Sequence, residues 1–142
     1  MGYYVRIIKS TAFVPAENLD RVYDIMCSLN ETHDHEKDGG SWSGTKRTGK
    51  WFSWMDENYP ETCKDAQAIF NELGFETAYD DVGNLHLVAY DSKMGQEDLF
   101  LKSISTNVIG KIDWIGEDGE TWSTVFMGDT VIDSQPVMKL LS

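Results

Sequence analysis

The chain has few of the residues that cross-link a fold or anchor it in a membrane. Its 142 residues include only two cysteines and three prolines. Cys27 and Cys63 lie far apart on the apolar faces of two predicted helices, which favours buried free thiols in a reducing compartment over a disulfide. The chain also lacks an apolar run of about 18 residues, so no membrane span is predicted.

The first nine residues show no sign of a secretory signal. Residues 1–9 read MGYYVRIIK, with an arginine inside the apolar stretch and no small-residue cleavage site. This segment is typical of a first β-strand. The cytoplasm is the predicted location.

Basic residues are scarce in most of the sequence. The chain has 24 acidic and 12 basic residues, a net charge of −12. Residues 1–50 hold seven of each, whereas residues 51–142 hold seventeen acids and only five lysines. Such an excess repels nucleic acid phosphates and attracts cationic surfaces. We therefore do not expect direct nucleic acid binding. We expect a protein partner that has a basic surface.

Hydrophobic periodicity predicts one domain of the α+β class over residues 1–142, with a mostly antiparallel sheet and two or three helices on one face. The expected helices are 16–30, one that Pro60 opens and Gly74 ends, and 96–106. The expected strands are 3–9, 75–79, 85–90, 110–115, 120–127 and 130–133. This order suggests a ferredoxin-like sheet with an added C-terminal hairpin. A plain antiparallel meander is the alternative.

Residues 31–50 have no apolar period and contain four glycines, so a long polar loop is expected there. His33 and His35, with the carboxylates of Asp34, Glu36 and Asp38, are the densest group of potential metal ligands, but their spacing matches neither H-x-H-x-D-H nor H-E-x-x-H. The segment 44–50 fits G-x-x-x-x-G-K, yet Trp51 follows where a phosphate loop needs Ser or Thr. No metal, cofactor or nucleotide site is predicted.

Four aromatic residues interleave with bases in and after this segment. Trp51, Phe52 and Trp54 are expected to close the core, whereas Trp42, isolated among Ser and Gly, is expected to be exposed. An exposed tryptophan is a common anchor in protein interfaces. We therefore include Trp42 among the predicted partner-binding residues.

The remaining predicted partner-binding residues are acids placed on turns and strand ends, where a rigid sheet can hold carboxylates in a pattern that imitates phosphates. They are Asp80, Asp81, Asp91, Glu97, Asp98, Asp113, Glu117, Asp118, Glu120 and Asp129. We expect them to converge on a single face. Simple solubility is the alternative explanation of the same charge. No catalytic motif is present: His86 lacks the following Ser or Thr of a two-histidine phosphoesterase, and no nucleophile elbow occurs.

The segment 110–122, GKIDWIGEDGETW, resembles a C-terminal hairpin found in small phage and bacterial proteins. In size, acidity and α+β pattern the whole chain resembles the small acidic proteins that phages encode against host defences, the anti-CRISPR and anti-restriction inhibitors. The resemblance implies a non-enzymatic nucleic-acid mimic that blocks the basic surface of a defence nuclease, and it assigns no functional residue. Two alternatives stay open: a small metal- or ligand-binding enzyme that uses the His33/His35 loop, and an oligomerising structural protein.

Overall fold

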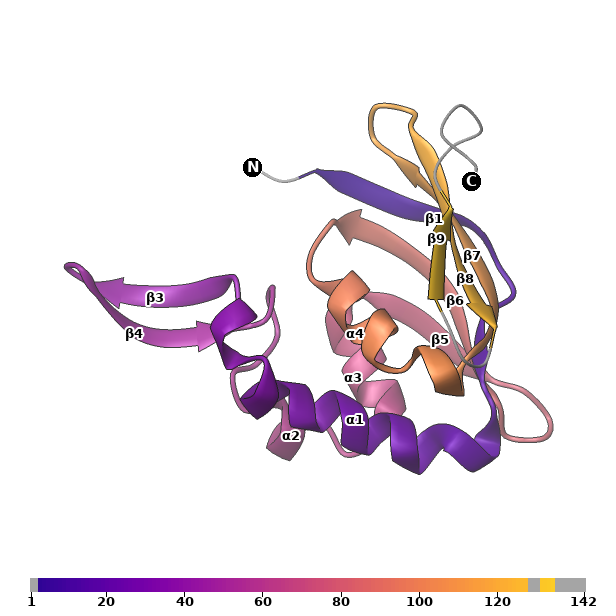
Figure 1. Ribbon diagram of the computed structural model, residues 1–142, viewed down its shortest axis with the longest axis horizontal. Coiled ribbons are helices and arrows are strands. Elements are labelled where there is room, and N and C mark those ends of the chain that lie inside the picture. The colour runs from indigo at the N-terminus through magenta and orange to yellow at the C-terminus, as the bar shows by residue number, and fades with distance from the viewer. Residues whose placement is uncertain (1–2, 128–130, 135–142) are drawn as a thin grey trace.

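The fold is of the α+β class, as the sequence predicts. The computed structural model describes residues 3–127 and 131–134 (Figure 1). In chain order its elements are β1 (Tyr4–Ser10), β2 (Phe13–Val14), the 3-10 helix η1 (Ala16–Asn18), α1 (Leu19–Thr32), η2 (Asp34–Glu36), β3 (Gly39–Ser43), β4 (Lys46–Trp51), α2 (Tyr59–Thr62), α3 (Ala66–Leu73), β5 (Phe75–Tyr79), β6 (Leu85–Lys93), α4 (Glu97–Ser103), η3 (Ser105–Asn107), β7 (Ile109–Gly116), β8 (Thr121–Met127) and β9 (Val131–Ser134).

The main sheet places the first strand in its centre. β1 and β2 both pair antiparallel with β6 on one side and with β7 on the other. β5 pairs with the outer edge of β6, and β8 and then β9 extend the sheet beyond β7. β1 and β5 are both antiparallel to β6, so they run parallel with β6 between them, which is a split β-α-β unit. The ferredoxin-like order with an added C-terminal hairpin is confirmed, and the meander alternative is wrong.

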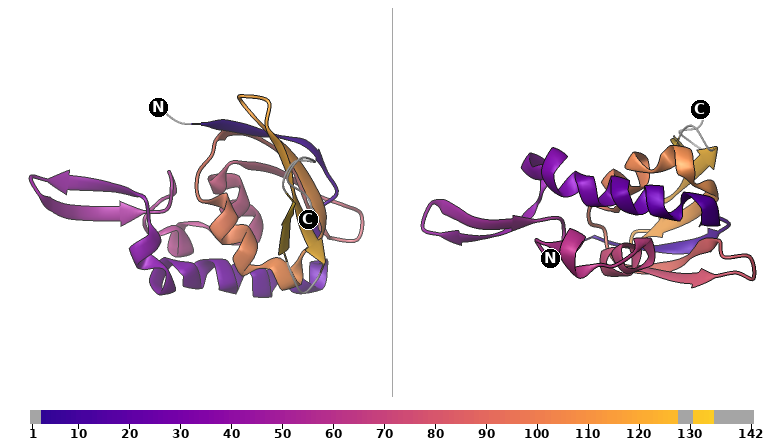
Figure 2. Two further views of the ribbon diagram at one scale, coloured as in Figure 1. Left: turned by 45° about the horizontal axis from the view of Figure 1, so that its top comes forward. Right: turned by 90° about the horizontal axis from the view of Figure 1, so that it is seen from below.

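The core lies between the helices and one face of the curved sheet (Figures 1 and 2). α1 contributes Val22, Met26 and Leu29 and contacts both α3 and α4. Alternate strand residues face these helices, because successive side chains of a strand point to opposite faces. The core-facing residues of the strands include Val5, Leu85, Leu87, Ile112, Trp114 and Phe126.

The helix predicted to start at Pro60 is two helices. Residues 63 and 65 have extended backbones, so α2 ends at Thr62 and α3 begins after Asp65, whose side chain accepts a hydrogen bond from the Ala68 amide at 2.9 Å. Gly74 ends α3 in the left-handed conformation, as predicted, and the Phe75 ring packs edge-on against Phe70. Both cysteines are free thiols; Cys63 is buried and Cys27 partly buried.

The predicted loop at 31–50 is wrong. α1 continues to Thr32, η2 follows, and residues 39–51 form an antiparallel hairpin, here called the arm, which projects away from the main sheet (Figure 1). Gly44, with φ of +65°, takes the first position of its two-residue turn, where a type II′ turn favours glycine. The arm leaves most side chains exposed, so its strands carry no apolar alternation for the sequence to reveal.

None of the helices in residues 3–127 and 131–134 has both the length and the apolar character needed to cross a bilayer.

Candidate functional site

The predicted partner-binding acids occupy four places in the fold. Asp80 and Asp81 lie in the β5–β6 turn, Asp91 and Asp113 on β6 and β7, and Glu97 and Asp98 at the start of α4; Glu117, Asp118 and Glu120 lie in or beside the β7–β8 turn. Asp129 lies outside the described residues.

One end of the sheet brings four of these acids together. In the pairing of β1 with its two neighbours, Arg6 lies opposite Asp91 on β6, and Val5 lies opposite Gly116 at the end of β7. Asp91 therefore lies close to the turn that begins at Glu117. A hollow of about 170 Å³ opens here, lined by Tyr4, Arg6, Asp91, Ile115 and Glu117 among others. We call Asp91, Glu117, Asp118 and Glu120 the acidic corner.

Hydrogen bonds from the start of β1 fix two carboxylates of the acidic corner. The Tyr4 amide donates to Glu117 Oε1 at 2.5 Å, and the Tyr3 hydroxyl donates to Asp118 Oδ1. The Glu120 amide also donates to Asp118 at 3.2 Å. The Tyr3 hydrogen bond lowers the pKa of Asp118, and the same bond raises the pKa of the Tyr3 phenol. Glu117 and Asp118 are thus held in set positions, and Asp118 is favoured in its ionised form.

The acids of the β5–β6 turn lie at the opposite end of the sheet. β6 has nine residues, so its two ends are roughly 26 Å apart at about 3.3 Å per residue. Asp80 holds its own turn: it accepts hydrogen bonds from the Val82 and Asn84 amides, each at 3.0 Å, and contacts His86 Nε2 at 2.8 Å. The His86 contact is the main cause that lowers the Asp80 pKa to about 2. The acids therefore do not gather in one place, contrary to the expectation that they converge on a single face.

Glu97 is not a surface acid. Glu97 is 3% exposed, its Oε1 accepts a hydrogen bond from the Gly95 amide at 2.8 Å, and the Tyr90 hydroxyl, which donates to the Lys93 carbonyl, lies 3.5 Å away. Burial raises the pKa of this carboxyl. The sequence placed it outside because a glutamate in the first turn of a helix is ordinarily solvated, but here the side chain folds inward to hold the segment before α4. Asp98, the next residue, is exposed.

Asp91 and Asp113 share their face of the sheet with bases. This face points away from the helices, and it includes Arg6 opposite Asp91 and Lys9 opposite Asp113. Lys111 Nζ lies 3.6 Å from Asp113, which also accepts a hydrogen bond from the Ser123 hydroxyl at 2.6 Å. Bases therefore offset both Asp113 and Asp91, although Asp91 belongs to the acidic corner, and the negative excess of the corner comes from Glu117, Asp118 and Glu120.

The histidines of the predicted loop are not gathered into a site. Nε2 of His33 and of His35 lie 3.9 and 3.7 Å from Glu36 Oε2, and both rings are partly or largely exposed. Within residues 3–127 and 131–134, no three His, Cys, Asp or Glu side chains come together in a way that could hold a metal ion. His86 lies elsewhere, stacked on Phe13 with ring centroids 5.2 Å apart.

Trp42 is exposed on the arm, as predicted. It is 62% exposed, and the Arg47 guanidinium lies 5.8 Å from the ring centroid. Of the aromatic residues expected in the core, Phe52 is buried, Trp51 is half-buried and Trp54 is exposed. The G-x-x-x-x-G-K segment spans the arm's turn and β4, so it makes no phosphate loop between a strand and a helix.

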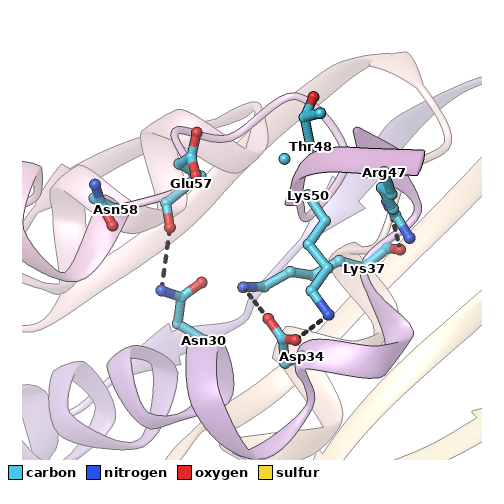
Figure 3. Close-up of a pocket in the computed structure, with 9 residues that line it drawn as sticks. Asn30, Asp34, Lys37, Arg47, Thr48, Lys50, Glu57 and Asn58 are labelled. Carbon is cyan, nitrogen blue, oxygen red and sulfur yellow. Dashed lines mark hydrogen bonds and ion pairs between the residues drawn. The ribbon is translucent and has the colours of Figure 1, made fainter. Parts of the chain in front are cut away.

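A polar pocket lies at the base of the arm, and the sequence does not predict it (Figure 3). The base pocket has a volume of about 440 Å³ and is lined by Asn30, Asp34, Lys37, Arg47, Thr48, Gly49, Lys50, Glu57 and Asn58. The two Asp34 carboxylate oxygens contact the ammonium groups of Lys37, at 2.8 Å, and Lys50. Both hydrogen bonds lower the pKa of Asp34, which falls to about 2, and the bond from Lys37 has the larger effect. The spacing of the bases was visible in the sequence, but the fold alone brings Asn30 and Glu57 to them.

No family model, curated protein or solved structure matches the chain. Its function is therefore inferred from the fold, the acidic corner and the base pocket.

Proposed function

We propose that the chain is a non-enzymatic interaction protein that binds a cationic protein surface through its acidic corner. The partner class that fits is a nucleic-acid-binding nuclease of a host defence system. The chain would act as a phage-encoded inhibitor of the anti-CRISPR or anti-restriction kind in the host cytoplasm. Covering a basic groove with carboxylates prevents its use by nucleic acid and needs no catalytic residue.

The observation that carries the proposal is the fixed geometry of the acidic corner. Glu117 and Asp118 are held by hydrogen bonds from Tyr4 and Tyr3 at the entry to β1, and the hollow beside Glu117 can admit a cationic side chain. Carboxylates that are already ordered lose little conformational entropy on binding. Such preorganisation gives a charged patch more affinity than the same charges on mobile side chains.

The charge of the whole chain supports the same proposal. A net charge of −12 steers a cationic partner toward the molecule and raises the association rate, most strongly at low salt. Rim charges act on association more than on the final affinity, so the corner provides contact and the rest of the body provides attraction.

The test uses the double variant Glu117→Gln/Asp118→Asn. Both amides keep a carbonyl oxygen that can accept the β1 hydrogen bonds, so the variant removes two charges and preserves the turn. The matched control is Glu17→Gln/Glu76→Gln, which removes two exposed charges elsewhere. Purified CRISPR effector and restriction nucleases are screened for complex formation and for loss of DNA cleavage at low and high salt.

We expect the native chain and the control to inhibit at least one nuclease at low salt, and we expect the corner variant to bind about three- to tenfold more weakly. Equal loss in both double variants would show that net charge alone matters and that the corner is not the site. Absence of any complex at low salt would overturn the proposed partner class.

A further inference from the structure

We propose that the base pocket binds a small phosphate-bearing molecule, with the phosphate held by Lys37, Arg47 and Lys50 and a hydrogen-bond donor of the organic part held by Asn30. This site is separate from the acidic corner, and it has the opposite preference for charge. Its ligand is a small molecule such as a sugar phosphate.

The first argument is the local charge. The ionisable residues that line the base pocket are Lys37, Arg47, Lys50, Asp34 and Glu57, which sum to +1. The chain as a whole carries −12. A positive pocket in so acidic a chain opposes the general field and creates a local preference for an anion.

The second argument is the donor capacity that Asp34 leaves. A lysine ammonium has three N–H donors. Asp34 receives one contact from Lys37 and one from Lys50, each on a different oxygen, so an anion beside the carboxylate can be bound by both ammonium groups (Figure 3). The Lys37 side chain is only 5% exposed and lies over the Phe52 ring, 5.5 Å from its centroid. A charge with so little contact to water binds an anion more strongly than a solvated lysine does.

The third argument is a pair of buried polar atoms that have no hydrogen-bond partner in the described part of the chain: the donor Nε of Arg47 and the acceptor Oδ1 of Asn30. The other ends of both side chains are fixed, since Arg47 Nη2 donates to the Lys37 carbonyl at 3.1 Å and Asn30 Nδ2 donates to the Glu57 carbonyl at 3.1 Å. Unpaired buried polar atoms destabilise a protein. Both residues line the base pocket, although neither atom is accessible to solvent, so a small shift of the side chains would let a ligand accept from Arg47 and donate to Asn30.

The combination decides the ligand class. Inorganic phosphate satisfies the bases but offers little to an acceptor, whereas a sugar phosphate has both an anionic group and hydroxyl donors. The pocket volume of about 440 Å³ lies in the range of roughly 300–1,000 Å³ that small-molecule sites occupy. The geometry is not that of a phosphate loop, because Lys50 projects from a strand.

The experiment titrates the isotope-labelled full chain with ribose 5-phosphate, inorganic phosphate and ribose, each at constant ionic strength, and follows backbone amide NMR shifts. We expect saturable shifts at residues 30–58 with ribose 5-phosphate, weaker saturable binding of inorganic phosphate, and none with ribose. Shifts that follow ionic strength alone, or that are absent with both phosphates, would overturn the proposal.

Two variants with opposite expected effects separate a binding site from a structural clamp. Lys50→Met should weaken ribose 5-phosphate binding roughly tenfold, because it removes one charged donor. Lys46→Met, on the same strand but outside the pocket, is the matched control and should bind as the native chain does. Asp34→Asn should bind more tightly, since it removes the carboxylate that competes for both lysines while the Gln96 side chain still holds the base of the arm.

Unchanged affinity in Asp34→Asn and Lys50→Met would contradict the site even if the native chain binds phosphate elsewhere. If Lys50→Met disturbs the arm, Asn30→Ala provides the second measurement. It removes the Oδ1 acceptor together with the Nδ2 hydrogen bond to the Glu57 carbonyl, and it should abolish the preference for ribose 5-phosphate over inorganic phosphate. Retention of that preference would contradict the role of Asn30.

Discussion

The arm and the rest of the chain, here called the body, are stabilised by different interactions. The arm contains Lys46, Arg47 and Lys50 and no acid, a net charge of +3, whereas the rest of the chain has nine bases against 24 acids, a net charge of −15. The body buries a continuous apolar core, but the arm is a two-stranded ribbon with most of its side chains exposed. The body is therefore held by apolar burial, and the arm by polar contacts at its base.

Those polar contacts are few and specific. The Gln96 side chain accepts hydrogen bonds from the Asp38 and Ser53 amides, each at 3.1 Å, and donates to the Glu36 carbonyl at 2.7 Å. Arg47 spans the hairpin base, and Asp34 joins Lys37 to Lys50. An isolated two-stranded hairpin is marginally stable in water. The clamp at the base, and not the ribbon itself, accounts for an ordered arm.

The largest expected difference between the two regions is in the free energy of unfolding that is lost when a tryptophan is replaced by alanine. Trp114 is 2% exposed, packs against the Tyr90 and Phe75 rings, and donates from Nε1 to the Thr124 hydroxyl at 3.2 Å. Trp114→Ala should lower the free energy of unfolding by about 3–5 kcal/mol. Trp42→Ala, the same substitution on the arm, should change it by less than about 0.5 kcal/mol.

Urea denaturation followed by circular dichroism measures both values. Similar losses in the two variants would mean that the arm packs on the body in solution, and the contrast between buried core and exposed ribbon would fail.

A smaller difference is expected between two glycines with positive φ. Gly74 has φ of +119°, and a Cβ there would lie 2.8 Å from Tyr90 Cε2, so Gly74→Ala combines backbone strain with a clash against a buried ring. We expect a loss of about 2–3 kcal/mol in global stability. Gly44 has φ of +65° in open space, so Gly44→Ala carries strain alone, about 1–2 kcal/mol.

The strain at Gly44 should act on the arm and leave global unfolding nearly unchanged. Thermal melting reports the Gly74 effect, and hydrogen exchange of amides 39–51 reports the Gly44 effect. A melting temperature that falls more in Gly44→Ala than in Gly74→Ala would reverse the assignment of strain to the two regions.

The same division explains what the sequence could predict. The body follows from apolar periodicity and turn residues: the pattern of α1, the cap at Gly74 and the strands β5 to β8 are set by local signals that burial reinforces. The arm has no such signal, because a ribbon that buries neither face carries no alternation, and residues 31–50 therefore resembled a loop. A hairpin held by backbone pairing alone, without apolar burial, cannot be predicted from hydrophobic periodicity.

The candidate sites were predictable only in part. The charge of Glu117 and Asp118 was evident, and their place in a turn was correctly expected. Their fixation by Tyr3 and Tyr4 depends on residues more than 110 positions away, and the inward turn of Glu97 depends on tertiary packing. Local sequence gives no measure of either contact.

The smallest expected effect concerns the arm in acid. The pKa of Asp34 is lowered from 3.8 to about 2 by Lys37 and Lys50, so the folded state binds this proton less readily than the unfolded state. The contribution of Asp34 to order in the arm is therefore complete above pH 4 and is lost as the pH falls toward 2. Amides 39–51 should lose hydrogen-exchange protection in that interval before the core amides of α1 and β6 do.

The control is Asp34→Asn, in which no carboxylate titrates at this position. The protection of its arm amides should therefore show no separate loss between pH 4 and pH 2. If the native arm and the variant arm respond identically to acid, then the Asp34 clamp does not hold the arm, and the polar network around Gln96 must do so alone.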